Sequence, residues 1–143
     1  MADAIQIEIV TPERALVKDS AQEVLLPGQG GYLGILPGHA PLVSLLSVGT
    51  LAYRDLQGQV QRLALDWGFA EVLPDKVTVL TRSAERASEI DVQRAEQAKA
   101  KAEAALKSAG PEDDIAKQMH ELARAQNRLE VAKISHDLAN LLP

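Results

Sequence analysis

One continuous segment, residues 76–106, contains both kinds of secondary structure that we expect in this chain: KVTVLTRSAERASEIDVQRAEQAKAKAEAAL. At its start, Val77 and Val79 alternate with polar residues, as in a strand that is buried on one face. After Arg82 the segment becomes rich in alanine, the residue with the highest helix propensity. The change of pattern predicts a β region followed by an α region.

The composition of the whole chain of 143 residues supports the same division. Eight of the nine glycines and all four aromatic residues precede Arg82, whereas residues 85–143 contain 13 alanines, one glycine and no aromatic residue. Glycine favours turns and aromatic residues favour strands. We therefore predict a two-part α+β chain: an N-terminal antiparallel β-sandwich or barrel over residues 1–84 and a C-terminal antiparallel α-helical hairpin over residues 85–143.

Short alternating runs fill the first part. Residues 5–9, IQIEI, show the strictest alternation, and pairs that contain proline or glycine separate the runs. The Gln-Gly pair at 57–58 predicts a β-hairpin that joins residues 51–55 to residues 59–66. Short strands between regular turn signals are typical of an antiparallel sandwich or barrel.

The second part predicts two helices with a break at Gly110 and Pro111. Ser88, followed three residues later by Asp91, is the predicted cap of the first helix. Apolar residues at helical spacing form one stripe on each helix: Ala95, Ala98, Ala102, Ala105 and Ala109 on the first, and Ile115, Met119, Leu122, Ala125, Leu129 and Ala132 on the second. A seam made largely of alanine buries little apolar area, so we expect a marginally stable hairpin that is able to open or dock again.

Charge and composition exclude several functions. The net charge is −5, from 15 basic and 20 acidic residues, which argues against nucleic acid as a partner. The chain has no cysteine, and no apolar run approaches the roughly 20 residues of a membrane span. No secretory signal is visible near the N-terminus, so we expect a soluble, intracellular protein.

The chain shows no pattern of residues that predicts catalysis. The glycine-rich residues 28–34, GQGGYLG, continue into residues 35–41, ILPGHAP, which contain no helix start of the kind that a phosphate-binding loop needs. The histidines at His39, His120 and His136 are not spaced as metal ligands. We predict no metal site and no enzymatic activity of the chain by itself.

Two arginines on the second helix, Arg124 and Arg128, leave two interpretations open. They lie four residues apart on one helix face, and the first helix offers Asp91, Arg94 and Lys101. Such residues form a solvated face with intrahelical pairs, or an anion site across the hairpin that holds a triphosphate or an acidic partner helix.

A family resemblance bears on this choice. Residues 27–43, PGQGGYLGILPGHAPLV, resemble the signature of the epsilon subunits of F-type ATP synthases, and residues 67–72, WGFAEV, resemble a second segment of that family. Trp67 stands where a glycine is commoner, which we interpret as a local packing variant. The resemblance covers essentially the whole chain, in the order sandwich and then hairpin.

The resemblance implies a non-catalytic subunit of the central rotor stalk of a proton-translocating ATP synthase. Its sandwich is held between the gamma subunit and the ring of c subunits, with Gly31, Tyr32 and His39 at the rotor and c-ring interface. The implied location is the cytoplasmic side of the plasma membrane, or the stromal or cytoplasmic side of a thylakoid, with membrane attachment only through the complex.

The same resemblance implies that the helical hairpin is a regulatory inhibitor. Folded down, it permits turnover; extended along gamma, it contacts the alpha and beta subunits and blocks ATP hydrolysis. The residues implied in the inhibitory contact are Arg124, Arg128 and Lys133.

Some bacterial members of this family bind ATP in the folded hairpin, as a regulatory ligand and not a required cofactor. Residues 90–95, IDVQRA, match their motif fully, and residues 124–129, RAQNRL, match the context of their second-helix arginines. Lys101 stands where strong binders carry arginine. Lysine offers a single point charge in place of the planar, bidentate guanidinium group of arginine. The implied ATP-binding residues are Glu85, Ile90, Asp91, Arg94, Ala95, Lys101, Arg124 and Arg128. The alternative function is a free-standing ATP-sensing module without a rotor partner.

Overall fold

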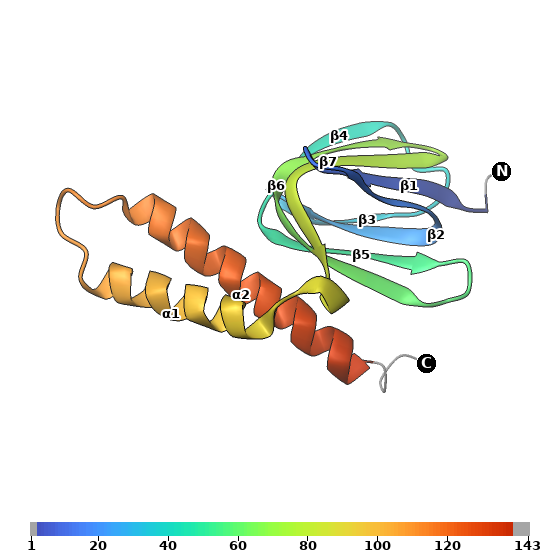
Figure 1. Cartoon of the computed structure of the whole chain (residues 1–143). Helices are drawn as coiled ribbons and strands as arrows, with labels where there is room; N and C mark the ends of the chain where they lie inside the picture. The colour runs from blue at the N-terminus through green and yellow to red at the C-terminus, as the bar shows by residue number, and fades with distance from the viewer. Residues whose placement is uncertain (1–2, 139–143) are drawn as a thin grey trace. The chain divides into compact units, whose positions relative to one another are not determined.

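The computed structural model describes residues 3–138, with only the backbone described for residues 135–138. The chain forms two compact units, Met1–Arg86 and Ala87–Pro143, which we call the β-sandwich unit and the helical unit. Figure 1 shows the strands of the first and the paired helices of the second. The predicted α+β class, a β-sandwich followed by a helical hairpin, is confirmed.

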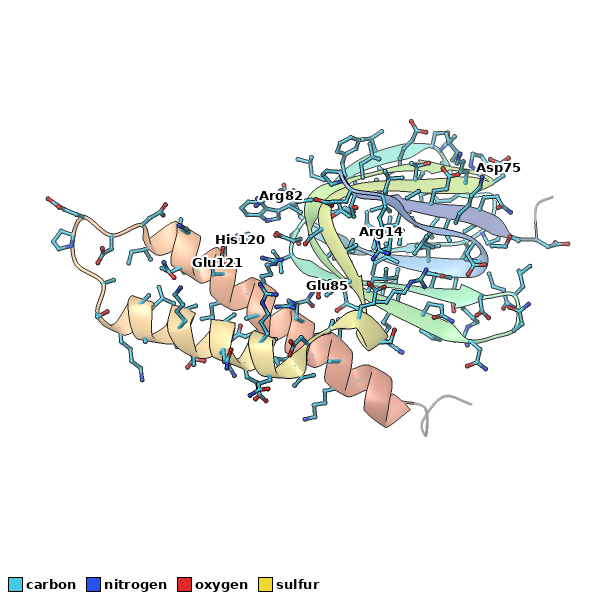
Figure 2. The ribbon with its side chains drawn as sticks, viewed as in Figure 1. Arg14, Asp75, Arg82, Glu85, His120 and Glu121 are labelled. Atoms are coloured by element: carbon cyan, nitrogen blue, oxygen red, sulfur yellow. The ribbon has the colours of Figure 1, made fainter. Side chains whose placement is uncertain are left out.

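Seven strands build the β-sandwich unit: β1 (Ile5–Val10), β2 (Ala15–Gly28), β3 (Gly31–Ile35), β4 (Leu42–Leu46), β5 (Gly49–Asp55), β6 (Val60–Leu73) and β7 (Lys76–Arg86). Their order is β1-β7-β6-β4-β2-β3, and β5 pairs with both β2 and β6. The expectation of an entirely antiparallel sheet was wrong at one pair, because β1 runs parallel to β7. The turn before β7, which contains Asp75 (Figure 2), helps to hold β1 there by accepting a hydrogen bond from the Gln6 N–H at 2.9 Å.

Large aliphatic side chains fill the core of this unit. The alternation at residues 5–9 places all three isoleucines of β1 completely inside. The other fully buried large side chains come from the six further strands: Leu26, Ile35, Leu46, Leu51, Leu63, Leu65, Val24, Val72 and Val77. Burial of one such side chain stabilises the folded state by about 1.5–3 kcal/mol relative to exposure, so the core supplies the main stability of the sandwich.

The predicted hairpin around residues 57–58 is confirmed as the turn between β5 and β6. Asp55 organises this turn, since its Oδ1 atom accepts hydrogen bonds from the N–H groups of Gln57 at 3.0 Å and Gln59 at 2.9 Å. Burial by itself raises the pKa of the Asp55 carboxyl, but hydrogen bonds from Gln59, Gln61 and Gln57 favour the charged form and together lower the pKa. Gly58 has a φ of 83°, a conformation that glycine adopts without steric cost.

Trp67 has an unusual backbone conformation within the pairing of β6 with β7. Asp66 is opposite Ser83 and Gly68 is opposite Thr81, in the same register as the rest of this pair, so neither strand has an extra residue at Trp67. Trp67 has a φ of 53°, in the left-handed region, and its carbonyl accepts a hydrogen bond from the Thr81 hydroxyl at 2.6 Å. The backbone at this position therefore favours glycine, and the tryptophan of this chain occupies a strained conformation.

The helical unit contains a short 3-10 helix, η1 (Ala87–Glu89), and two α-helices, α1 (Val92–Lys107) and α2 (Ile115–Leu138). The two α-helices pack against each other in antiparallel directions (Figure 1), as predicted. The prediction that Ser88 caps the first helix was wrong, because Ser88 lies within η1. Asp91 is the N-cap, and its side chain accepts a hydrogen bond from the Arg94 N–H at 3.1 Å.

Small side chains dominate the interior of the helical unit. Its buried residues are Ile90, Ala95, Ala102, Ala125, Asn127 and Val131. The predicted apolar stripe on α2 was wrong at its start, where Ile115 and Met119 are exposed and Gln118 lies beside Ala102. The regular 3,4 spacing drifts around a straight α-helix by about 20° per heptad, so a stripe defined over many turns does not keep facing the same neighbour.

Candidate functional site

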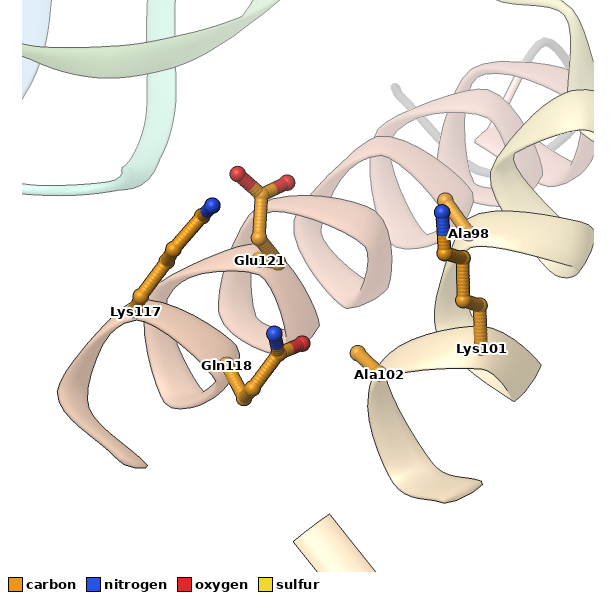
Figure 3. A pocket seen from close by; sticks show the side chains of 6 residues that line it. All are labelled: Ala98, Lys101, Ala102, Lys117, Gln118 and Glu121. Atoms are coloured by element: carbon orange, nitrogen blue, oxygen red, sulfur yellow. The ribbon is translucent and has the colours of Figure 1, made fainter. Parts of the chain in front are cut away.

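A cavity of about 360 Å³ lies between α1 and α2 (Figure 3). Its lining comes from three residues of each helix: Ala98, Lys101 and Ala102 of α1, and Lys117, Gln118 and Glu121 of α2. The two alanines leave space that larger side chains would fill. Figure 3 shows the side chains of Lys101, Lys117 and Glu121 extending to the same side of the hairpin.

Cationic side chains continue from this cavity along the hairpin. Arg94 precedes Lys101 by seven residues, which is two helical turns, so both lie on one face of α1. On α2, Arg124 and Arg128 follow Lys117 by seven and eleven residues and share a face in the same way. We call this set of five residues the basic face. The sequence interpretation missed Lys117, although its spacing from the two arginines would have identified it.

The residues of the IDVQRA segment have structural roles that explain most of the motif. Ile90 and Ala95 are buried in the helical unit, and Asp91 caps α1. Arg94 is exposed. Any ligand would therefore meet Arg94 directly, while the other three residues shape the start of α1.

The remaining predicted ATP-binding and inhibitory residues are distributed over both units. Arg124 and Arg128 are half-buried, and Lys101 is exposed. Glu85 belongs to β7 of the β-sandwich unit, where it is opposite Ala64 of β6. Lys133 is exposed on α2, but it follows Arg128 by five residues and so points about 140° away from the basic face.

The predicted rotor contacts lie in and after β3. Tyr32 is exposed, and its hydroxyl accepts a hydrogen bond from the Thr50 N–H at 3.2 Å. Gly31 has a φ of 132° at the turn from β2. The Nδ1 atom of His39 lies 2.7 Å from the carbonyl of Ala40, which fixes the imidazole against its own loop. Gly31 and Tyr32 are exposed and His39 is half-buried, and the three show no arrangement for chemistry.

A polar cluster that the sequence interpretation missed holds the end of β7. The Tyr53 hydroxyl donates a hydrogen bond to Asp19 at 2.9 Å, and Arg86 donates one to the carbonyl of Leu16 at 3.1 Å. Burial, and then the hydrogen bond to Asp19, raise the pKa of Tyr53 to about 12. The cluster fixes the last residue of the β-sandwich unit against β2, and we assign it a structural role.

Among residues 3–138, no group of three or more histidine and carboxylate side chains is placed to hold a metal ion. No helix in this part of the chain is long and apolar enough to cross a membrane. The fold and the site together define a class: a two-part chain in which a β-sandwich precedes a helical hairpin that carries a basic face.

Comparison with known proteins identifies the family. The family model described as "ATP synthase, Delta/Epsilon chain, beta-sandwich domain" matches residues 4–87, and the one described as "ATP synthase, Delta/Epsilon chain, long alpha-helix domain" matches residues 88–133. The chain belongs to the ATP synthase delta/epsilon family, as an epsilon subunit of the bacterial type. The family resemblance stated from the sequence is thereby confirmed.

Curated relatives agree with this assignment. The ATP synthase epsilon chain of Koribacter versatilis is 58% identical over 112 residues, which cover 78% of each chain. The ATP synthase epsilon chain of Geobacter sulfurreducens is 44% identical over 133 residues, which cover 92% of this chain and 96% of that one.

Solved structures with the same fold come from mitochondrial ATP synthases. A chain in the cryo-EM structure of the Euglena gracilis enzyme, described as OSCP/F1/c-ring in rotational state 1, matches 98% of this chain and 84% of its own length, with a TM-score of 0.71 and 19% identity. A chain in the Tetrahymena thermophila structure of the central stalk and c-ring matches 92% of this chain and 95% of its own length, with a TM-score of 0.55 and 11% identity. At these identities the likeness concerns the fold alone.

Proposed function

We propose that this chain is a non-catalytic subunit of the central rotor stalk of a proton-translocating ATP synthase. Its β-sandwich unit joins the gamma subunit to the c-ring, with Gly31, Tyr32 and His39 on the assembly surface, and its helical unit inhibits ATP hydrolysis by changing position. In this role the chain is bound to the cytoplasmic side of the membrane through the complex. Membership of the epsilon family is the observation that carries the proposal.

The interior of the hairpin supports a switch. Three of the six buried residues in its described part are alanines, so separation of α1 from α2 exposes little apolar area. Two positions of such an element differ by a small free energy, and a ligand or partner that prefers one of them shifts the population.

The basic face supports ATP as the ligand of the compact state. A cavity of about 360 Å³ is in the range of small-molecule sites, which span roughly 300–1,000 Å³. Arg124 and Arg128 supply planar forks for phosphate oxygens, and Lys101 and Lys117 supply point charges. Glu121 lines the same cavity and opposes a polyphosphate by like-charge repulsion.

The same arginines also support the inhibitory contact. In the extended position Arg124 and Arg128 pair with an acidic segment of the alpha and beta subunits, while Lys133, on another face of α2, makes a separate contact in the same state. The two uses exclude each other because they need the same side chains. ATP therefore favours the compact state through its differential affinity, and falling ATP releases the inhibitor.

Calorimetry on the full chain tests ATP binding. We expect saturable binding by the wild type and its loss in the Arg124→Ala, Arg128→Ala double variant. Glu121→Gln should tighten binding several-fold because it removes the opposing charge, and Lys107→Ala, in the last turn of α1 outside the basic face, is the matched control. Equal affinities of the wild type and the double variant would refute the ATP site.

Reconstitution tests the rotor role. The chain is added to the catalytic complex of the same organism after removal of this subunit, and co-purification with gamma and ATP hydrolysis are measured. Wild type should co-purify and lower hydrolysis, whereas the double variant should co-purify without inhibition. If wild type binds ATP but joins no complex, the free-standing ATP-sensing alternative is correct.

A further inference from the structure

The cavity between α1 and α2 carries charges of both signs. Lys101 and Lys117 are exposed at its border, and in Figure 3 the half-buried Glu121 lies between them. None of the side chains that the structure describes forms an ion pair with Glu121. Carboxylates that are partly removed from water are usually paired with a cation or coordinate a metal. Glu121 is therefore available to a cation that enters the cavity together with a ligand.

The lining of the cavity suits the polar end of a ligand. Among the described residues, its apolar part is limited to the methyl groups of Ala98 and Ala102, and Gln118 adds an amide. A nucleobase has no aromatic side chain to stack on, because residues 85–143 contain none. The ammonium groups of the two lysines are donors for phosphate oxygens. The cavity therefore favours the polyphosphate end of a nucleotide and leaves the base to another part of the hairpin.

Glu121 makes this cavity a poor site for a polyphosphate without a metal. The carboxylate repels the phosphate oxygens that the lysines attract. A divalent cation reverses the sign of this interaction, because Mg²⁺ commonly binds through one or two carboxylates together with the phosphates of a substrate and keeps water as its other ligands. Among residues 3–138 no group of three or more histidine and carboxylate side chains could hold the ion alone, so the ion has to arrive with the phosphates.

We propose that the cavity binds the terminal phosphates of a nucleoside triphosphate as their complex with Mg²⁺, and that Glu121 is the carboxylate that meets the metal. Lys101 and Lys117 then bind the phosphate oxygens that the metal leaves free. This inference rests on the proposed function, in which the hairpin binds ATP. It goes further by assigning the metal complex, and not the free nucleotide, as the ligand that stabilises the compact hairpin.

Calorimetry on the full chain tests the role of Glu121 through the sign of the metal effect, with ATP as the probe in EDTA or in excess Mg²⁺. Wild type should bind the Mg²⁺ complex several-fold more tightly than free ATP. In Glu121→Gln the order should reverse. Free ATP should bind this variant more tightly because the repulsion is gone. The complex should bind it more weakly, because Mg²⁺ cancels part of the phosphate charge and no carboxylate meets the ion.

Glu130→Gln is the matched control for the change in net charge. Glu130 is exposed on the same helix and follows Glu121 by nine residues, which places it about 180° around α2. This variant should keep the wild-type preference for the complex. The same reversal in Glu130→Gln would show that net charge causes it, and would contradict a contact between Glu121 and the metal.

A measurement on the wild type alone locates the ion without any variant. With Mn²⁺ in place of Mg²⁺, the paramagnetic ion bound with ATP should broaden the amide NMR signals of residues 98–102 and 117–121 more than those of residues 128–131. Broadening centred on residues 128–131 would overturn the inference.

The outcomes separate this inference from the proposed function. Tighter binding of free ATP than of the complex by the wild type would overturn the inference and leave ATP binding intact, and so would an equal metal effect in wild type and Glu121→Gln. Binding of neither form by the wild type would refute the proposed ATP site itself.

Discussion

The β-sandwich unit and the helical unit bury different kinds of side chain. The sandwich encloses isoleucine, leucine and valine side chains from all of its strands, whereas half of the six buried residues in the described part of the helical unit are alanine. Apolar burial contributes about 25 cal/mol per Å², so the sandwich has a much larger driving force per residue. The difference indicates a rigid unit suited to permanent assembly and a weakly held unit suited to changing its contacts.

The largest expected effect tests the rigidity of the sandwich at Gly68, where β6 lies against β7. A Cβ atom at Gly68 would lie 2.1 Å from the carbonyl oxygen of Leu80 and 2.8 Å from the Cα of Thr81. Both atoms belong to the backbone, so β6 and β7 would have to separate. Gly68→Ala should cost about 5 kcal/mol or more and prevent folding of the sandwich. Gly34→Ala, where nothing lies within 4 Å, is the control and should stay within about 0.5 kcal/mol in urea unfolding.

A matched pair of core truncations compares the two units directly. Leu51→Ala in the sandwich should lower the free energy of unfolding by about 2–5 kcal/mol, and Val131→Ala in α2 by about 2 kcal/mol. Hydrogen exchange should report the first loss in the strands and the second in the helices. Loss of protection in both units from either variant would show that the two units unfold together. It would contradict the view that one unit is rigid and the other weakly held.

Removal of the α1 cap tests whether the hairpin is held weakly. Asp91→Ala removes the acceptor of the Arg94 N–H and should destabilise the helical unit by about 1 kcal/mol. Exchange of the first amides of α1 should accelerate while the strands keep their protection. Asp114→Ala, which removes the corresponding acceptor of the Lys117 N–H, is the control and should act on α2 alone.

The smallest effect concerns the pH dependence of the sandwich. The folded-state pKa of Asp55 lies below its unfolded value of 3.8, so the stability from its ionised form is present above pH 3.8 and is lost as the pH falls through the folded pKa. Asp55→Asn should therefore be less stable than wild type at neutral pH, and the difference should shrink toward acidic pH. A difference that stays constant down to pH 2 would contradict a role for the charge.

Much of this division could be predicted from the sequence, because periodicity and composition act locally. Alternation at residues 5–9 and the Gln-Gly pair at 57–58 each depend on a few neighbouring residues. The parallel β1–β7 pair and the left-handed backbone of Trp67 escaped prediction because they depend on strands that meet only in the folded sheet.

Parts of the candidate site escaped prediction for the same kind of reason. The spacing of Lys117 from Arg124 and Arg128 places it on their face of α2, but only the register of the two helices shows that it borders the cavity. Asp91 was predicted to belong to both a capping motif and an ATP motif, and a sequence pattern does not separate these roles. The structure assigns it the cap, and ATP binding stays a prediction.

The parallel pairing of β1 with β7 also determines how late in biosynthesis β1 can complete its pairing. Ile7 pairs with Val77, about 70 residues later, so the first strand has no parallel partner until nearly all of the sandwich has left the ribosome. At about 5–20 residues per second, that wait lasts about 4–14 s. Until then β1 has only β2 as a partner, so a nascent chain that stalls before residue 76 should need a chaperone, whereas one that stalls after the whole sandwich has left the ribosome should already contain it folded.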